Sequence, residues 1–201
     1  MTETQQQLAQ RGRIPPELIA PGDVAIDAGA NVGEVTKQLV DLGAIVHAYE
    51  PHPAAFERLE KRFGGHDRVT LHHAALSDRS GTTQLYLHQN SAQDPVYWST
   101  GSSLMAGKRN VNPETSVEVP AVDIAEAVRT IGAPVRLIKM DVEGAEAVLL
   151  RRLIETDLLG EIGTLLVEPH GASIEGLEGE LDAVRSRIDG IAGADVRFDW
   201  V

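Results

Sequence analysis

One stretch of the chain, residues 24–51, most strongly constrains how it can fold. It reads VAIDAGANVGEVTKQLVDLGAIVHAYEP, which is an apolar run, a turn with two glycines, an amphipathic segment and a second apolar run. This order predicts a strand, a tight turn, a helix and a second strand. Nucleoside cofactors bind to such units above the N-terminus of the helix, where backbone N–H groups are unpaired. Glu50 ends the second run about twenty residues after Gly29, where an acid can accept hydrogen bonds from ribose hydroxyls.

The glycine turn distinguishes between two kinds of cofactor. A dinucleotide site is typified by G-x-G-x-x-G, whereas the pattern here is D-x-G-x-x-x-G, with Asp27 before the first glycine and Asn31 in the middle. Gly29 and Gly33 would let a ligand approach the backbone closely. An acid at the mouth of the turn would repel a pyrophosphate but would attract S-adenosylmethionine, which carries a sulfonium and an ammonium group. We therefore expect S-adenosylmethionine as the cofactor.

Composition narrows the class of protein. The 201 residues are enough for one domain with a sizeable core, and the formal net charge of −12 argues against a general nucleic-acid-binding protein. The absence of cysteine excludes disulfide scaffolds, thiolate metal sites and cysteine nucleophiles. No run approaches the roughly 18 apolar residues of a membrane-spanning helix, and residues 1–13 lack an apolar signal core, so we expect a cytoplasmic protein that does not bind membranes.

Strand-like and helix-like segments alternate along most of the chain. We expect strands at 24–26, 44–49, 69–75, 135–140, 163–167 and 194–201, a turn at 76–81, and helices starting near Val32, Pro53, Asp123, Ala145 and Ile174, the last reaching Ile191. This alternation predicts an α/β fold with a Rossmann-like, doubly wound, mainly parallel sheet in three α/β/α layers. Residues 1–20 would be an N-terminal extension or lid, and residues 21–201 would form the main domain.

A long irregular segment, residues 88–114, interrupts this alternation. It reads HQNSAQDPVYWSTGSSLMAGKRNVNPE and lies between two alternating segments, 83–87 and 117–119, which we expect to pair as a hairpin. Long loops in compact domains are usually functional or mobile. We interpret this one as a substrate-side flap, and the alternative is a variable insertion without a specific role.

Polar residues follow two of the expected strands directly. Asp141 comes after 135–140, and Glu168 and His170 come after 163–167. Ligands of parallel sheets bind beyond the carboxyl ends of the strands. His170 is the best candidate for a general base, because an unperturbed imidazole titrates near neutral pH. The alternative is a surface histidine in the turn.

Asp141, Glu168 and His170 also form a candidate metal site. Carboxylate oxygens suit Mg²⁺, whereas two carboxylates with an imidazole suit Mn²⁺ or iron better, and such an ion would bind and acidify vicinal hydroxyls of an acceptor. Alternatively, Asp141 contacts the amine of the cofactor or caps the following helix. Lys139 lies inside the strand before Asp141 and should pair with an acid, with Glu143 and Glu146 as candidates.

Several short motifs occur in a fixed order along residues 21–171. They are GDVAIDAGANVG, YEPHPAAFERL, AALSDRSG, GSSL, the Val-Pro-x-Val-Asp of 119–123, LIKMDVEGAE and VEPHG. In this order they resemble the FkbM family of S-adenosylmethionine-dependent methyltransferases. The resemblance implies a class I methyltransferase fold with a seven-stranded sheet that ends in an antiparallel hairpin. It also implies O-methylation of hydroxyl groups on natural products, secondary metabolites or glycans.

The resemblance also implies roles for individual residues. It places the methionine part of the cofactor beside Asp27, Gly29, Asn31 and Gly33, the ribose at Glu50 and the adenine at Ala75, Leu76 and Ser77, and it makes Asp141 and Glu143 the signature acids of the fourth strand end. For the terminal hairpin we find only the single strand 194–201. An open edge strand there would weakly favour a homodimer.

Two other classes of function remain open at this level. An NAD-type or nucleotide-sugar oxidoreductase would need G-x-G-x-x-G and a Tyr-x-x-x-Lys pair, and the sequence contains neither. A non-catalytic nucleoside-binding module would not need acids at the strand ends, and these acids are present. We therefore expect an O-methyltransferase whose partner is a small hydroxylated molecule.

Overall fold

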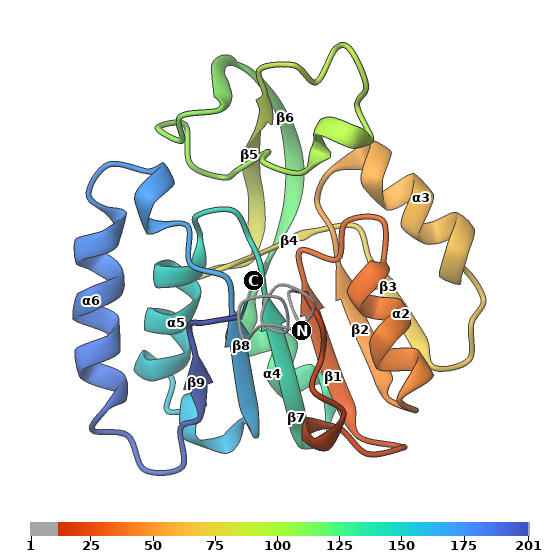
Figure 1. Ribbon diagram of the computed structural model, residues 1–201, viewed down its shortest axis with the longest axis vertical. Coiled ribbons are helices and arrows are strands. Elements are labelled where there is room, and N and C mark those ends of the chain that lie inside the picture. Colours follow the sequence, from red (N-terminus) through yellow and green to blue (C-terminus); the bar gives the residue numbers. More distant parts are fainter. Residues whose placement is uncertain (1–11, 201) are drawn as a thin grey trace, which may run out of the picture.

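The computed structural model describes residues 12–200, and its centre is a parallel sheet (Figure 1). The six strands lie in the order β3-β2-β1-β7-β8-β9, and every neighbouring pair is parallel. Their bounds are β1 Val24–Ala28, β2 Ile45–Tyr49, β3 Val69–His72, β7 Val135–Met140, β8 Thr164–Val167 and β9 Val196–Arg197. The strand order reverses between β1 and β7. The carboxyl ends of these two strands therefore form the switch point at which such sheets bind ligands.

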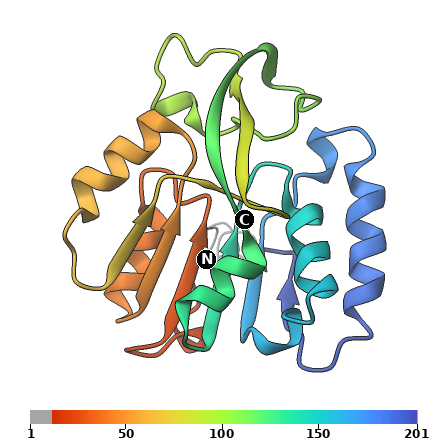
Figure 2. The same ribbon diagram turned by 180° about the vertical axis from the view of Figure 1, so that it is seen from behind.

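Helices cover both faces of this sheet (Figures 1 and 2). One face carries α2 (Glu34–Asp41) and α3 (Pro53–Phe63). The other carries α4 (Ile124–Ile131), α5 (Glu146–Glu155) and α6 (Leu177–Ile188). The prediction of a Rossmann-like fold with three α/β/α layers is confirmed.

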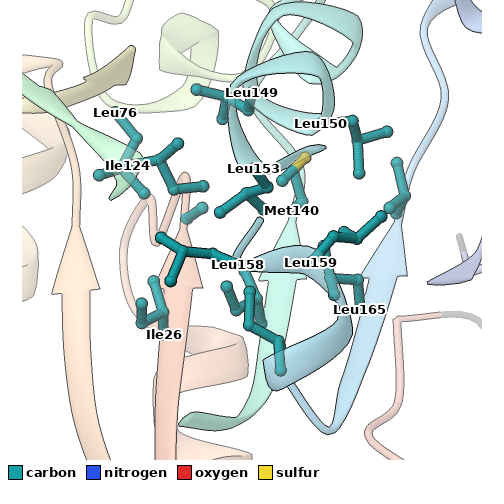
Figure 3. Packing of buried hydrophobic residues seen from close by; sticks show 14 of the residues in the cluster. Ile26, Leu76, Ile124, Met140, Leu149, Leu150, Leu153, Leu158, Leu159 and Leu165 are labelled. Carbon is teal, nitrogen blue, oxygen red and sulfur yellow. The ribbon is translucent and has the colours of Figure 1, made fainter. Parts of the chain in front are cut away.

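The larger hydrophobic core lies beneath α4, α5 and α6. Leu149, Leu150 and Leu153 of α5 pack in one cluster with Met140 of β7 and Leu165 of β8 (Figure 3), and none of these side chains is exposed. Burying a leucine or methionine side chain stabilises a fold by about 1.5–3 kcal/mol. This cluster therefore fixes β7 and β8, whose ends carry the candidate catalytic residues.

A second core covers the opposite face, under α2 and α3. It includes Leu18, the last residue of the short helix η1 (Pro16–Leu18), and Trp200 from the other end of the described chain. The Trp200 indole donates a hydrogen bond to the Arg13 carbonyl over 3.1 Å. Residues 12–20 of the predicted extension thus pack against the main domain, whereas residues 1–11 of that extension lie outside the described residues.

A smaller sheet stands beside the parallel one, with strands in the order β4-β6-β5. Its strands are β4 (Ala75–Ser77), β5 (Gly81–His88) and β6 (Val111–Asp123), and β5 and β6 form the predicted antiparallel hairpin. The prediction of one strand over 69–75 was wrong. The Ala74 N–H bonds to the His72 carbonyl, so the chain turns out of the parallel sheet, and the expected turn at 76–81 begins inside β4.

Three further boundaries differ from the sequence prediction. The irregular segment is shorter, because residues 111–114 belong to β6. Helix α6 begins only at Leu177, because a short helix η4 (Gly171–Ser173) precedes it and Gly176 has a left-handed backbone with φ 82°. Within residues 12–200 the parallel sheet has six strands, and β9 lies parallel to β8, so the expected antiparallel hairpin is absent there. The homodimer stays a prediction.

None of the helices in residues 12–200 combines the length and the apolar composition that crossing a bilayer requires.

Asp123 connects the smaller sheet to the large core and offers a test of this packing. Its carboxylate accepts the Ala125 N–H at the start of α4, over 2.8 Å, and the Arg152 Nε of α5, over 3.0 Å. We expect Asp123→Ala to lower the free energy of unfolding by about 2–3 kcal/mol, since a helix cap and a charge-assisted bond are both lost. Chemical denaturation measures this change.

The matched control is Asp41→Ala, which removes an exposed pair with Lys37. That variant should lose less than about 1 kcal/mol. Equal losses in the two variants would contradict a special role for Asp123.

Candidate functional site

A cavity of about 320 Å³ opens at the carboxyl ends of β1, β2 and β7. Its volume falls at the lower end of the range of roughly 300–1,000 Å³ that small-molecule sites occupy. The predicted site residues in its wall are Gly29, Asn31, Glu50, Ala75, Leu76, Asp141 and Glu143. Asp27, Gly33, Ser77, Glu168 and His170 do not line it. The structure thus brings together residues that the sequence spreads over more than half of the chain.

Close packing requires both glycines of the turn. A Cβ atom on Gly29, where φ is 75°, would lie 1.8 Å from the Asp141 carbonyl oxygen. A Cβ on Gly33 would lie 2.6 Å from the Phe63 ring of α3. The absence of a side chain at Gly29 therefore allows the ends of β1 and β7 to converge, which is what forms the floor of the cavity.

Glu50 and Asn31 form the part of the wall that suits a ribose. The Glu50 carboxylate accepts the Asn31 N–H over 2.8 Å and the His52 N–H over 2.7 Å. Each oxygen keeps a second lone pair for a ligand hydroxyl. Only 5% of Glu50 is exposed, and this burial raises its pKa to about 7, although the two N–H bonds act in the opposite direction.

Asp27 is not at the mouth of the turn, contrary to our expectation. It is fully buried in β1, where its carboxylate accepts the Thr36 hydroxyl over 2.6 Å and lies 3.2 Å from the Lys139 ammonium. Lys139 therefore pairs with Asp27, and also with Asp141 at 3.6 Å, rather than with Glu143 or Glu146. Burial alone would lower the pKa of Lys139, but the charges of Asp27 and Asp141 raise it above its ordinary value.

His170 lies beside the cavity among three carboxylates. Its Nδ1 is 2.9 Å from Glu146, and its Nε2 is 3.2 Å from Glu143 and 3.9 Å from Asp141. Burial alone would lower the pKa of His170, but the Glu146 hydrogen bond and the charges of the three carboxylates raise it to about 9. This raised pKa favours the imidazolium at neutral pH, a form that cannot accept a proton.

A compact set of metal-type ligands exists, but it differs from the expected one. Asp141, Glu143 and His170 offer ligand atoms that all lie within 4.8 Å of one another, and Glu168 is not part of the group. Burial and the charge of Asp141 raise the pKa of Glu168. The comparisons with known proteins described below do not support a metal. The Lys108 ammonium contacts Glu143, so this carboxylate already has a cationic partner.

Sequence reasoning missed several residues that line the cavity. Ser99, Thr100, Ser102, Ser103 and Leu104 come from the irregular segment, which had been interpreted only as a flap. The GSSL motif, residues 101–104, was the available signal for three of these residues. Lys139 and His52 also line the cavity, although neither was expected to.

Comparison with known proteins identifies the family of this chain. The model of the FkbM methyltransferase domain matches residues 27–182. The chain belongs to the FkbM methyltransferase family. It is an S-adenosylmethionine-dependent methyltransferase, and the matched region runs from the glycine turn through α5 and into α6.

Individual relatives are distant. The 31-O-demethyl-FK506 methyltransferase FkbM of Streptomyces tacrolimicus is 26% identical in an alignment of 190 positions, which covers 83% of this chain and 72% of that protein. An rRNA methylase from Streptococcus thermophilus is 12% identical with a TM-score of 0.46, over 87% of this chain and 74% of its own. A chain from a fibrillarin/Nop5p complex is 14% identical, also with a TM-score of 0.46, and the match covers 92% of this chain and 67% of that chain. Both TM-scores are below 0.5, and the strand order and the family match assign the fold.

The pKa of Glu50 predicts how cofactor binding depends on pH. A carboxylate accepts ribose hydroxyls better than a carboxylic acid does, and its ionised fraction rises as the pH passes through about 7. We expect the affinity for S-adenosylhomocysteine to increase about tenfold from pH 6 to pH 8, in proportion to that fraction. Isothermal titration calorimetry at several pH values measures it.

Glu50→Gln is the control for this measurement. It should bind S-adenosylhomocysteine more weakly, with an affinity that stays constant over the same pH range. An equally steep pH dependence in the variant would show that another group is responsible.

Proposed function

We propose that this methyltransferase transfers the methyl group of S-adenosylmethionine to a hydroxyl oxygen of a small natural product, sugar or similar molecule. The observation that carries the proposal is the position of Asp141. Its carboxylate lies in the same cavity wall as Glu50 and Asn31, and 29% of its side chain is exposed. A carboxylate at that point can receive the proton that a hydroxyl loses during methyl transfer.

The geometry favours Asp141 over His170 as the proton acceptor. His170 is protonated at neutral pH, and its two ring nitrogens face Glu146 and Glu143. It therefore lacks a free lone pair and instead orients the neighbouring carboxylates. The Lys139 ammonium lies 3.6 Å from the Asp141 carboxylate, and the His170 ring lies 3.9 Å from it on the other side. Methyl transfer from a sulfonium then requires mainly that the acceptor oxygen, the methyl carbon and the sulfur are aligned.

The charges of the cavity wall narrow the class of acceptor. The acidic side chains in the wall are Glu34, Glu50, Asp141 and Glu143, and among the described residues the only lysine or arginine in it is Lys139. The charge of Lys139 is already shared with Asp27 and Asp141. A phosphorylated or carboxylated acceptor would meet net repulsion, so the acceptor is neutral or cationic.

The distant relative supports oxygen as the accepting atom. Its name specifies a 31-O-demethyl substrate, which describes a hydroxyl that awaits a methyl group. The low identity of 26% supports this reaction class but not the same acceptor.

Labelled methyl transfer tests the proposal directly. The protein is incubated with methyl-labelled S-adenosylmethionine and a set of neutral hydroxylated compounds, and the products are identified by mass spectrometry. We expect Asp141→Asn to reduce transfer about 100-fold or more, because a general base typically contributes at least that much. Asp41→Asn, an exposed carboxylate on α2, should leave transfer unchanged.

Two further results would separate this account from its rivals. S-adenosylhomocysteine, but not NAD, should raise the melting temperature of the wild-type protein.

Above pH 9 the rate of methyl transfer should fall, because His170 loses its proton as the pH rises through its pKa of about 9. The pH-dependent loss should be absent in His170→Ala. Stabilisation by NAD alone, or full transfer by Asp141→Asn, would contradict the proposal.

Chelation tests the metal hypothesis. Lys108 and His170 already neutralise Glu143, so the proposal needs no ion. We expect labelled transfer to persist after dialysis against EDTA. A loss of transfer that Mg²⁺ or Mn²⁺ restores would instead establish a metal at Asp141, Glu143 and His170.

A further inference from the structure

A short part of the irregular segment covers the cavity. We call residues 99–109 the cover segment; it begins at the end of the short helix η2 (Tyr97–Ser99). Ser99, Thr100 and Leu104 line the cavity. At the cofactor side, the Ser99 hydroxyl accepts the Asn31 side-chain amide over 3.1 Å. The cover segment therefore contacts the glycine turn directly.

Glu143 attaches the cover segment to the end of β7. One oxygen of its carboxylate accepts the Gly101 N–H over 2.8 Å, and the other contacts the Lys108 ammonium. Lys108 also donates to the Gly101 carbonyl over 3.1 Å, and the Ser103 hydroxyl donates to the Glu143 carbonyl over 2.6 Å. A single carboxylate thus joins both ends of the cover segment.

The surroundings show that this attachment is specific. Only 4% of Lys108 is exposed, and an ammonium group is buried at that level only when it is paired. Glu143 has a left-handed backbone with φ 55°, which disfavours any residue other than glycine. A side chain on the next residue, Gly144, would lie 2.3 Å from Ile174. The left-handed backbone at Glu143 and the close packing at Gly144 thus accompany the contacts of Glu143 with the cover segment.

The remaining attachments of the cover segment are hydrogen bonds to β5 and to η4, and one of them involves a side chain: the Ser102 hydroxyl accepts the His88 N–H over 3.2 Å. Ser103 exchanges two of them with Tyr86 of β5, and the Arg109 N–H bonds to the Ser173 carbonyl. These bonds hold two points along the segment. Residues 99–101, which face the glycine turn, have their connection to β7 through Glu143.

We propose that the ion pair of Lys108 and Glu143 is a latch that closes the cover segment over the donor cavity and limits the release of S-adenosylhomocysteine. This rests on the proposed function, because that function makes S-adenosylhomocysteine the product. Lys108 is the positioning residue: it does not line the cavity, so it acts on the ligand only through Glu143 and the segment. The latch must open once in each turnover to exchange product for a new cofactor.

Lys108→Met tests the latch while keeping the packing of the aliphatic stem. Glu143 retains His170 as a partner at 3.2 Å, so the variant does not leave a lone buried charge. We expect hydrogen exchange of residues 99–109 to become about tenfold faster, since local opening costs less free energy. Exchange in β1 and α5 should stay unchanged. Stopped-flow dissociation of S-adenosylhomocysteine should accelerate by a similar factor.

Matched variants distinguish the latch from a general effect. Lys61→Met removes the same charge from an exposed pair with Glu57 and should change neither measurement. Glu143→Gln should reproduce the faster exchange of residues 99–109, which guards against a folding defect particular to Lys108→Met.

The outcomes also separate the latch from the function on which it rests. Failure of S-adenosylhomocysteine to bind the wild-type protein would overturn the proposed function. If it binds, unchanged exchange in both latch variants would overturn the latch alone. Faster exchange with an unchanged dissociation rate would overturn the control of product release.

Discussion

One buried ammonium group organises the site of this methyltransferase. The Lys139 Nζ donates to the Gly29 carbonyl over 2.6 Å and lies 3.2 Å from the Asp27 carboxylate and 3.6 Å from that of Asp141. Lysine is rarely buried to this extent unless it is paired. Because it neutralises Asp27 and holds the backbone of the turn, the ends of β1 and β7 can converge without leaving an unpaired buried charge. The cavity exists because this convergence is stable.

The charged side chains at the strand ends form a connected series that begins at Lys139. Asp141 lies between Lys139 and His170, and His170 lies between Glu143 and the buried Glu146. Each carboxylate therefore has a cationic neighbour, and each cation has more than one carboxylate. Such an arrangement fixes the direction of each side chain, which proximity catalysis requires. It also leaves the wall of the cavity with an excess of negative charge, which is consistent with a cationic cofactor.

Sequence reasoning succeeded where a local pattern determines the geometry. The strand, glycine turn and helix of residues 24–51, the acid Glu50 and the strand end at Asp141 all follow from short-range periodicity and from where strands end. Sequence reasoning failed where two interacting residues lie far apart in the sequence. Asp27 points into the protein because Lys139 pairs with it. The pKa of His170 is set by Glu146, and Lys108 meets Glu143 across 35 residues. None of these pairings is visible in spacing, because the topology of the sheet creates them.

We propose that the cavity at the β1–β7 switch point binds the methyl donor with its ribose on Glu50 and its sulfur near Asp141. A crystal structure of the complex with S-adenosylhomocysteine tests it most directly. Both ribose hydroxyls should lie within about 3 Å of the Glu50 carboxylate, at hydrogen-bonding distance, with the homocysteine part beside Asn31 and Asp141 under residues 99–109. A ligand bound elsewhere, or one whose ribose does not contact Glu50, would contradict it.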